Sequence, residues 1–135
     1  MSPSMLDTDI LSEFLRGNEI IVRHVDEYLK EYGFISLSII TYYEILNGLL
    51  YKDAKKQLKK FESFVSLNNV LLLTIKSTKL AANIQADLRK KGREIGHADT
   101  MIAGIAIANK LQLVTNNTQH FNRIKKLELV NWLKL

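Results

Sequence analysis

Three acidic residues in separate parts of the chain stand where carboxylates could do chemistry. Asp7 ends a short apolar segment, where it could cap a helix or bind a ligand. Glu44 belongs to a predicted helix that is apolar around most of its circumference. Asp99 lies in the first turn of a predicted helix whose following residues are nearly all small or apolar. Hard divalent cations such as Mg²⁺ and Mn²⁺ prefer oxygen ligands, so these carboxylates could bind a metal if the fold brings them together.

Two further features point to a crevice lined by oxygen atoms. Thr41, Glu44 and Gly48 share one narrow stripe of their predicted helix. Glycine inside a helix costs roughly 1 kcal/mol relative to alanine, which predicts that another group approaches Gly48 closely. The run 113–121 passes from an apolar strand into Thr, Asn and Gln, which predicts a loop. If that strand lies beside the first strand, the loop faces the same crevice as Asp7.

Short apolar runs alternate with longer helical patterns, which is typical of an α/β domain. The expected strands cover 4–7, 34–37, 70–74, 111–115 and 127–132, and the expected helices cover about 8–17, 19–32, 39–51, 53–67, 76–91 and 97–110. Most connections are long enough for helical crossovers, which favours a mainly parallel sheet of four to five strands. We therefore expect a three-layer α/β/α sandwich, and the lack of a linker or repeat predicts a single domain over residues 1–135.

Composition excludes several classes of protein. The chain has 135 residues, 47% of them apolar, one Pro and no Cys, which excludes collagen-like and disordered chains and zinc sites built on thiolates. No apolar run is long enough to cross a bilayer, and the N-terminus lacks the features of a signal peptide. We therefore expect a cytoplasmic protein without a membrane segment. The net charge of +5 is compatible with a phosphate-rich partner.

Four blocks of the sequence resemble, in order, the motif blocks of PIN-domain ribonucleases. They are MLDTDIL at 5–11, TYYEILNG at 41–48, IGHADTMIAGIA at 95–106 and LVTNNTQHF at 113–121. The chain is most similar to the VapC toxins of prokaryotic toxin–antitoxin pairs, in the subgroup of initiator-tRNA endonucleases. The similarity covers nearly the whole chain, through Trp132.

Carried over residue by residue, this resemblance implies a set of metal-binding residues. Asp7, Glu44 and Asp99 fall on the three metal-binding acidic positions of the family. Asn117 falls on the fourth position, where many members have Asp. An amide binds a metal only through a neutral oxygen or a water molecule, so the resemblance leaves open whether one metal or two are bound.

Other residues fall near the implied site. Asp9 is often Asn in the family and adds charge to the rim, and Thr115 matches a frequent Thr or Ser whose hydroxyl could orient a ligand or water. A basic run could contact RNA phosphates or form a solvated helix face, and it consists of Arg89, Lys90, Lys91 and Arg93. His97 could touch substrate or donate a proton, but a lone histidine near the start of a helix is more often structural, and we interpret His120 in the same way. No two histidines show metal-ligand spacing.

The residues and the resemblance together predict a Mg²⁺- or Mn²⁺-dependent endoribonuclease, in which metal-activated water cleaves RNA and leaves a 5′-phosphate and a 3′-hydroxyl. The family implies structured RNA as substrate, with an initiator tRNA as the target of the subgroup. It also implies a VapB-type antitoxin, whose C-terminal segment blocks the acidic pocket and through which alone the complex contacts DNA. The apolar surface of the helix 39–51 exceeds what one sheet can cover, which suggests a homodimer.

Two other hypotheses remain open at this point. One is a catalytically silent PIN-like module that binds RNA or protein. The other is a phosphoacceptor receiver domain, which also carries acidic residues at strand ends. A receiver domain requires an acceptor Asp after the middle strand and a Lys after a later strand, and neither 74–76 nor 115–117 supplies them cleanly.

Overall fold

Parallel pairing of short strands forms the central sheet of the computed structural model, which describes residues 1–134. The strands are β1 (Ser4–Leu6), β2 (Ser36–Ser38), β3 (Asn69–Leu71), β4 (Gln112–Val114) and β5 (Leu129–Val130). They lie in the order β3-β2-β1-β4-β5, and each neighbouring pair is parallel. The predicted parallel sheet is therefore confirmed, and the first and fourth strands are neighbours.

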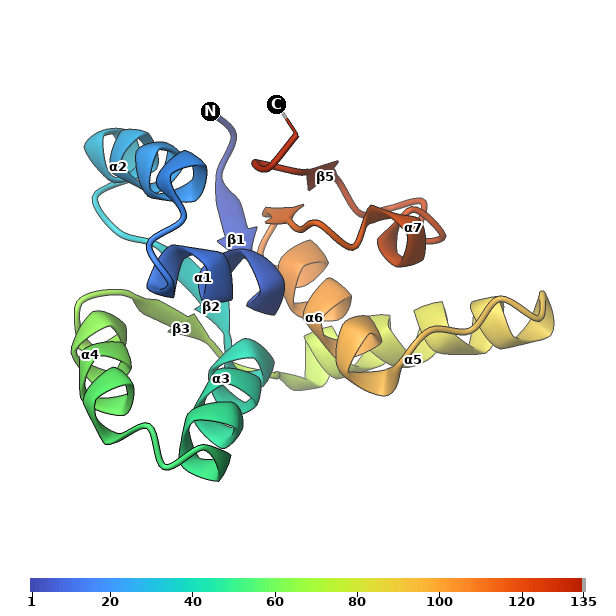
Figure 1. Cartoon of the computed structure of the whole chain (residues 1–135). Coiled ribbons are helices and arrows are strands. Elements are labelled where there is room, and N and C mark those ends of the chain that lie inside the picture. The colour runs from blue at the N-terminus through green and yellow to red at the C-terminus, as the bar shows by residue number, and fades with distance from the viewer. Residues whose placement is uncertain (135) are drawn as a thin grey trace.

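Helices cover both faces of this sheet and make the three layers that the sequence predicts (Figure 1). They are α1 (Thr8–Leu15), α2 (Glu19–Tyr32), α3 (Ile39–Tyr51), α4 (Lys55–Ser66), α5 (Ile75–Lys90), α6 (His97–Ala108) and α7 (Thr118–Phe121). The first four pack on one face and α5 to α7 on the other. Within residues 1–134, no helix combines the length and the apolar character that crossing a membrane requires.

Alternation of side chains along the strands divides the core into two parts. Leu6 and Val114 are fully buried against the layer of α1 to α4. Their neighbours Met5 and Leu113 are fully buried against the layer of α5 to α7. Successive residues of a strand point to opposite faces, so a strand of three residues is enough to contribute to both cores.

The sheet is shorter than the sequence predicts because its hydrogen-bonded ladders end early. β2 begins at Ser36 and not at the predicted residue 34. The Ile35 amide donates a 2.7 Å hydrogen bond to the Asn68 side chain and not to the backbone of a neighbouring strand. Ser38 then ends β2 by capping α3, with its side chain accepting a hydrogen bond from the Thr41 amide. β3 therefore has no partner beyond Leu71, although the apolar run continues past it.

The predicted loop after β4 contains a short helix, α7. This helix has four residues, and no helical period can be detected over that length in a sequence. Phe121 at its end is fully buried in the core of α5 and α6, which fixes the position of the segment. The loop prediction for 116–121 is wrong over these four residues.

Two helical glycines differ in their surroundings. A Cβ on Gly104 of α6 would lie 2.4 Å from the Ser77 carbonyl oxygen of α5, so α5 and α6 can pack this closely only because position 104 lacks a side chain. A Cβ on Gly48 of α3 would meet no atom within 4 Å. No part of the described chain, residues 1–134, therefore makes the predicted close approach to Gly48.

Alanine substitutions at these glycines should have opposite effects. We expect Gly104→Ala to lower the free energy of unfolding by about 1–3 kcal/mol, because a backbone carbonyl must move to admit the methyl group. Gly48→Ala should leave it unchanged or raise it by up to about 1 kcal/mol through helix propensity. Urea unfolding followed by circular dichroism measures both values. Equal effects of the two substitutions would contradict this account of the packing of α5 on α6.

Candidate active site

The acidic residues lie where the strand order reverses. The chain runs outward from β1 through β2 to β3 and then returns to β4 on the other side of β1. Ligands in open α/β sheets bind at such a switch point, beyond the carboxyl ends of the strands. Asp7 directly follows β1 and Thr115 directly follows β4. The expected meeting of the polar loop with Asp7 is therefore observed.

Asp7 is the most deeply buried of the acidic residues, with 6% of its surface exposed. Its Oδ1 accepts a 2.8 Å hydrogen bond from the Thr8 amide, as an N-cap of α1. Its Oδ2 accepts a 2.8 Å hydrogen bond from the Thr115 hydroxyl. Burial, together with the nearby charges of Asp9 and Asp99, nevertheless raises the pKa of Asp7 to about 7. These hydrogen bonds are thus too few to offset the cost of an ionised carboxylate at this position.

Asp9 connects α1 to the loop after β4. One of its oxygens accepts a 2.7 Å hydrogen bond from the Ile10 amide, and the other accepts a 2.9 Å bond from the Asn116 amide. Burial raises the pKa of Asp9 as well. The predicted contribution of Asp9 to the negative charge at the rim agrees with this position.

Glu44 reaches the same region from α3. Its Oε1 accepts a 2.6 Å hydrogen bond from the hydroxyl of Thr8, which also lies 3.0 Å from Thr41 Oγ1. Thr41 is fully buried, whereas Glu44 and Gly48 of the same stripe line an open groove. Thr8 was not predicted as a site residue, although its position next to Asp7 at the start of α1 was the available signal.

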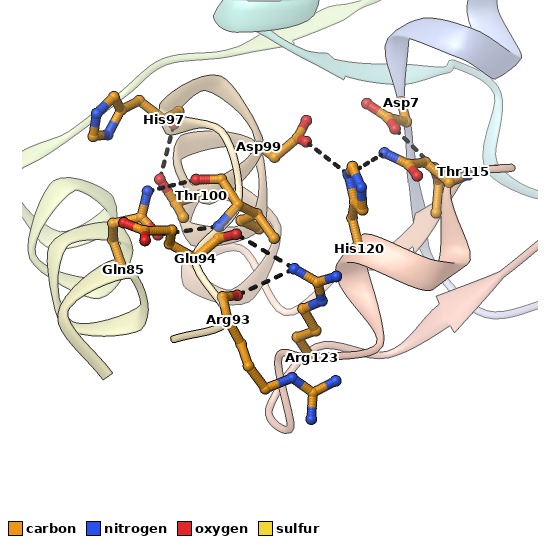
Figure 2. Close-up of polar contacts among 12 residues, drawn as sticks. Asp7, Gln85, Arg93, Glu94, His97, Asp99, Thr100, Thr115, His120 and Arg123 are labelled. Atoms are coloured by element: carbon orange, nitrogen blue, oxygen red, sulfur yellow. Dashed lines mark hydrogen bonds and ion pairs between the residues drawn. The ribbon is translucent and has the colours of Figure 1, made fainter. Parts of the chain in front are cut away.

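Asp99 projects from the first turn of α6 toward Asp7 (Figure 2). We call the place where Asp7, Asp9, Glu44 and Asp99 meet the acidic cleft. Burial raises the pKa of Asp99, and the charge of Glu44 raises it further. His120 of α7 lies close by, with Nδ1 3.9 Å from Asp99 Oδ2 and 3.1 Å from the Asn117 amide nitrogen. His120 is thus an exposed residue beside the site, whereas the ring of His97 extends away from Asp99.

Asn117 contacts its neighbours in the polar loop. Its backbone amide donates a 3.0 Å hydrogen bond to Thr115 Oγ1, the hydroxyl that in turn donates to Asp7. Its side chain lies against His120. The amide thus stands at the edge of the cleft, where the family resemblance places a fourth acidic residue.

The donor set fits a hard divalent cation. The negative charges of Asp7 and Asp99 repel each other, and Glu44 adds a third negative charge beside Asp99. A bound cation would relieve this repulsion. No three acidic or histidine side chains of residues 1–134 stand close enough to enclose a metal by themselves. Mg²⁺ often binds through only one or two carboxylates and keeps several waters, so an open arrangement suits it.

The predicted basic run lies at the end of α5 and in the following loop, outside the acidic cleft. Arg89 pairs with Glu94 at 3.6 Å, and Lys91 pairs with Asp87 at 3.1 Å. Lys90 and Arg93 are exposed. The run is therefore an exposed surface near the start of α6, and its side chains do not contact the carboxylates of the cleft.

A groove of about 350 Å³ adjoins the acidic cleft on the side of α3. Thr8 and Glu44 line one end of it. Farther along, its wall combines apolar residues of α1 and α3 with basic residues, namely Leu15, Arg16, Ile45, Gly48, Leu49, Lys52 and Lys60. Gly48 therefore borders an open groove, which explains why no other part of the chain touches it.

Comparison with known proteins agrees with the motif blocks. The family model described as the PIN domain matches residues 4–127. The tRNA(fMet)-specific endonuclease VapC of Shigella flexneri is 32% identical over 129 residues, which cover 95% of this chain and 96% of that protein. Ribonuclease VapC2 of Rickettsia felis is 33% identical over 131 residues, which cover 96% and 98% of the two chains.

A solved structure extends the agreement to the fold. The crystal structure of VapBC2 from Rickettsia felis, bound to a DNA fragment from its promoter, contains a chain that matches this one with a TM-score of 0.86 at 30% identity. The match covers 96% of this chain and 98% of that chain. Sequence and structure thus agree over nearly the whole length, and the chain belongs to the PIN-domain family, in its group of VapC ribonucleases.

Proposed function

We propose that the protein is a Mg²⁺- or Mn²⁺-dependent endoribonuclease that cleaves structured RNA as the toxin of a toxin–antitoxin pair. The observation that carries the proposal is the meeting of Asp7, Glu44 and Asp99 at the β1/β4 switch point, where burial and the charges of neighbouring carboxylates raise the pKa of Asp7 and of Asp99. Buried carboxylates without a partner lower the free energy of unfolding, and a bound cation would offset this cost. The tRNA(fMet)-specific activity named for the Shigella flexneri relative suggests an initiator tRNA as the target.

Each residue of the cleft has a distinct part in this proposal. Asp7, Glu44 and Asp99 would bind the metal, one or two of them directly and the rest through its waters, and the metal would lower the pKa of water and offset charge on the phosphoryl group. Thr115 positions Asp7 through its hydroxyl, and Thr8 positions Glu44 in the same way. The products carry a 5′-phosphate and a 3′-hydroxyl.

The groove beside Glu44 suits the C-terminal segment of a VapB-type antitoxin. Its apolar wall can bury the hydrophobic side chains of a peptide, and it leads directly to the acidic cleft. A basic side chain of that segment would enter the cleft and neutralise the carboxylates in place of a metal. The Rickettsia felis VapBC2 complex was solved on promoter DNA, and we infer that DNA contact here also runs through the antitoxin complex.

We also infer a homodimer, because several large apolar side chains are exposed on neighbouring elements. Tyr43 of α3 is 65% exposed, Leu72 after β3 is 63% exposed and Ile75 at the start of α5 is 78% exposed. Their neighbours in the chain pack instead against the core of α5 to α7, and these are Ile39, Ile40, Leu71 and Leu73. An exposed apolar patch of this kind marks an interface more often than a bare surface.

Removal of one carboxylate separates the nuclease from a silent binding module. We expect Asp99→Asn to lower the cleavage rate of a transcribed tRNA with Mg²⁺ by roughly 100-fold or more, because even residues that only support metal ligands contribute 10- to 100-fold. The exposed substitution Asp26→Asn on α2 is the control and should retain the parent rate. A silent module would show no cleavage by the parent and no heat of Mn²⁺ binding in calorimetry.

The raised pKa of Asp7 predicts how stability depends on pH in the absence of metal. Asp7 ionises near 3.8 in the unfolded chain and near 7 in the fold, so its contribution to stability is present below about pH 4 and lost as the pH rises through 7. We expect Asp7→Asn to remove this loss and to raise the free energy of unfolding at pH 8 by on the order of 2 kcal/mol.

Thermal melts across pH test this expectation and also report metal binding. Mn²⁺ at pH 8 should raise the melting temperature of the parent and should affect Asp7→Asn much less. Asp26→Asn again serves as the control. The proposed metal-binding role of Asp7 would be contradicted if the stability of the parent did not fall between pH 4 and 8, or if Mn²⁺ did not change its melting temperature.

Light scattering with size-exclusion chromatography tests the dimer. The parent should elute as a dimer and Ile75→Glu as a monomer, because a buried charge would face the partner copy. Leu67→Glu is a matched control, since Leu67 at the end of α4 is 79% exposed and lies outside the apolar patch. If Leu67→Glu dissociates the protein and Ile75→Glu does not, the interface lies elsewhere.

A further inference from the structure

We propose that the cavity between α5 and residues 123–126 is a second contact site for RNA, which binds the sugar–phosphate backbone beyond the cleavage position. This inference rests on the proposed nuclease function and adds a substrate-binding surface to it. In the structure a second basic segment lies beside the basic run 89–93. That segment contains Arg123, Lys125 and Lys126.

Arg123 joins the two basic segments. Its Nη1 donates to the carbonyl oxygens of Arg93 and Glu94, each at 3.3 Å (Figure 2). These bonds hold the loop before α6 against the chain that follows α7. Lys91 of the first segment and Arg123, Lys125 and Lys126 of the second therefore line one cavity.

The cavity on this surface has a volume of about 330 Å³. Ile84, Leu88, Ile107 and Ile124 form an apolar floor, and Lys91, Arg123, Lys125 and Lys126 supply positive charge around it. The Nε atom of Arg123 is buried and has no hydrogen-bond partner within residues 1–134. A phosphate cannot reach this atom, so the positive groups that the cavity offers to a ligand are chiefly the exposed Lys125 and Lys126.

The charges on this surface are only partly neutralised. Asp87 and Glu94 pair with Lys91 and Arg89. Among the described residues 1–134, no ion pair involves Lys90, Arg93, Lys125 or Lys126. A ligand with several regularly spaced negative charges therefore complements the surface better than one carboxylate does.

The position of this surface relative to the acidic residues favours RNA over an acidic protein as the polyanion. Arg123 follows His120 by three residues, and His120 lies 3.9 Å from Asp99. An RNA whose scissile phosphate lies among the carboxylates must extend away from them, because its other phosphates are repelled there. Arg123 lies beyond His120 as seen from Asp99 (Figure 2), so an RNA that leaves the carboxylates past His120 meets positive charge there.

Charge reversal at the two exposed lysines tests the site. The parent and the double variant Lys125→Glu/Lys126→Glu are titrated with a transcribed tRNA in EDTA, and fluorescence anisotropy is followed at several salt concentrations. We expect the variant to bind roughly tenfold more weakly at low salt, and the slope of log affinity against log salt to become shallower by about 1–2. Lys55→Glu/Lys59→Glu on the exposed side of α4 is the matched control and should change the affinity less than twofold.

Cleavage assays distinguish the failure of this inference from the failure of the proposed function. The double variant should cleave a tetranucleotide as the parent does but show a raised KM for the tRNA, because only the longer RNA reaches the cavity. A parent that cleaves neither substrate overturns the nuclease assignment. A parent that cleaves both, with a double variant that matches it in tRNA affinity, salt slope and KM, overturns the second contact site alone. An acidic protein partner would also leave those three values unchanged and so counts against the proposal.

Discussion

A hydrogen bond of 2.8 Å from Thr115 to Asp7 joins the ends of β1 and β4, and the geometry of the cleft depends on it. Because the two strands are neighbours, the residues that follow them meet, although they are far apart in the sequence. Asp7 then starts α1 as its N-cap, which places Thr8 against Glu44. Thr115 also accepts a bond from the Asn117 amide, which sets the course of the chain into α7. One contact at the switch point thus orients three elements of the candidate site.

Ionised carboxylates in the cleft lower the free energy of unfolding of the metal-free protein. The pKa values of Asp7, Asp9 and Asp99 are all raised, so ionising each of them in the fold costs free energy at neutral pH. A divalent cation and a basic side chain of a partner would relieve the same repulsion. In the proposed function the two therefore compete for one place, which is why a protein inhibitor that brings a positive charge can suppress a nuclease that requires a metal.

Sequence patterns predicted the fold well and the details of the site less well. Helical periodicity located the six longer helices, and the order of apolar runs located the five strands, because burial acts on every residue of such elements. The observed start of β2 at Ser36 and end of β3 at Leu71 differ from the predicted residues 34 and 74. These ends could not be predicted, because they depend on where the neighbouring strand still offers a backbone hydrogen bond. Acidic residue types indicated the cleft, whereas the contact of His120 with Asp99 depends on a short helix without a detectable period.

In the proposed function, the separation of charge on this small protein follows from the opposite needs of a metal and of an RNA. A cluster of carboxylates attracts cations but repels the phosphates that must reach it, and at physiological ionic strength the repulsion extends over about 8 Å. Positive side chains placed beyond that distance can hold the polyanion without displacing the metal. The net charge of +5, weak as an indicator by itself, thus gains meaning from the structure. Arg93, Arg123, Lys125 and Lys126 lie outside the acidic cleft and not within it, where they would pair with its carboxylates and occupy the place of the cation.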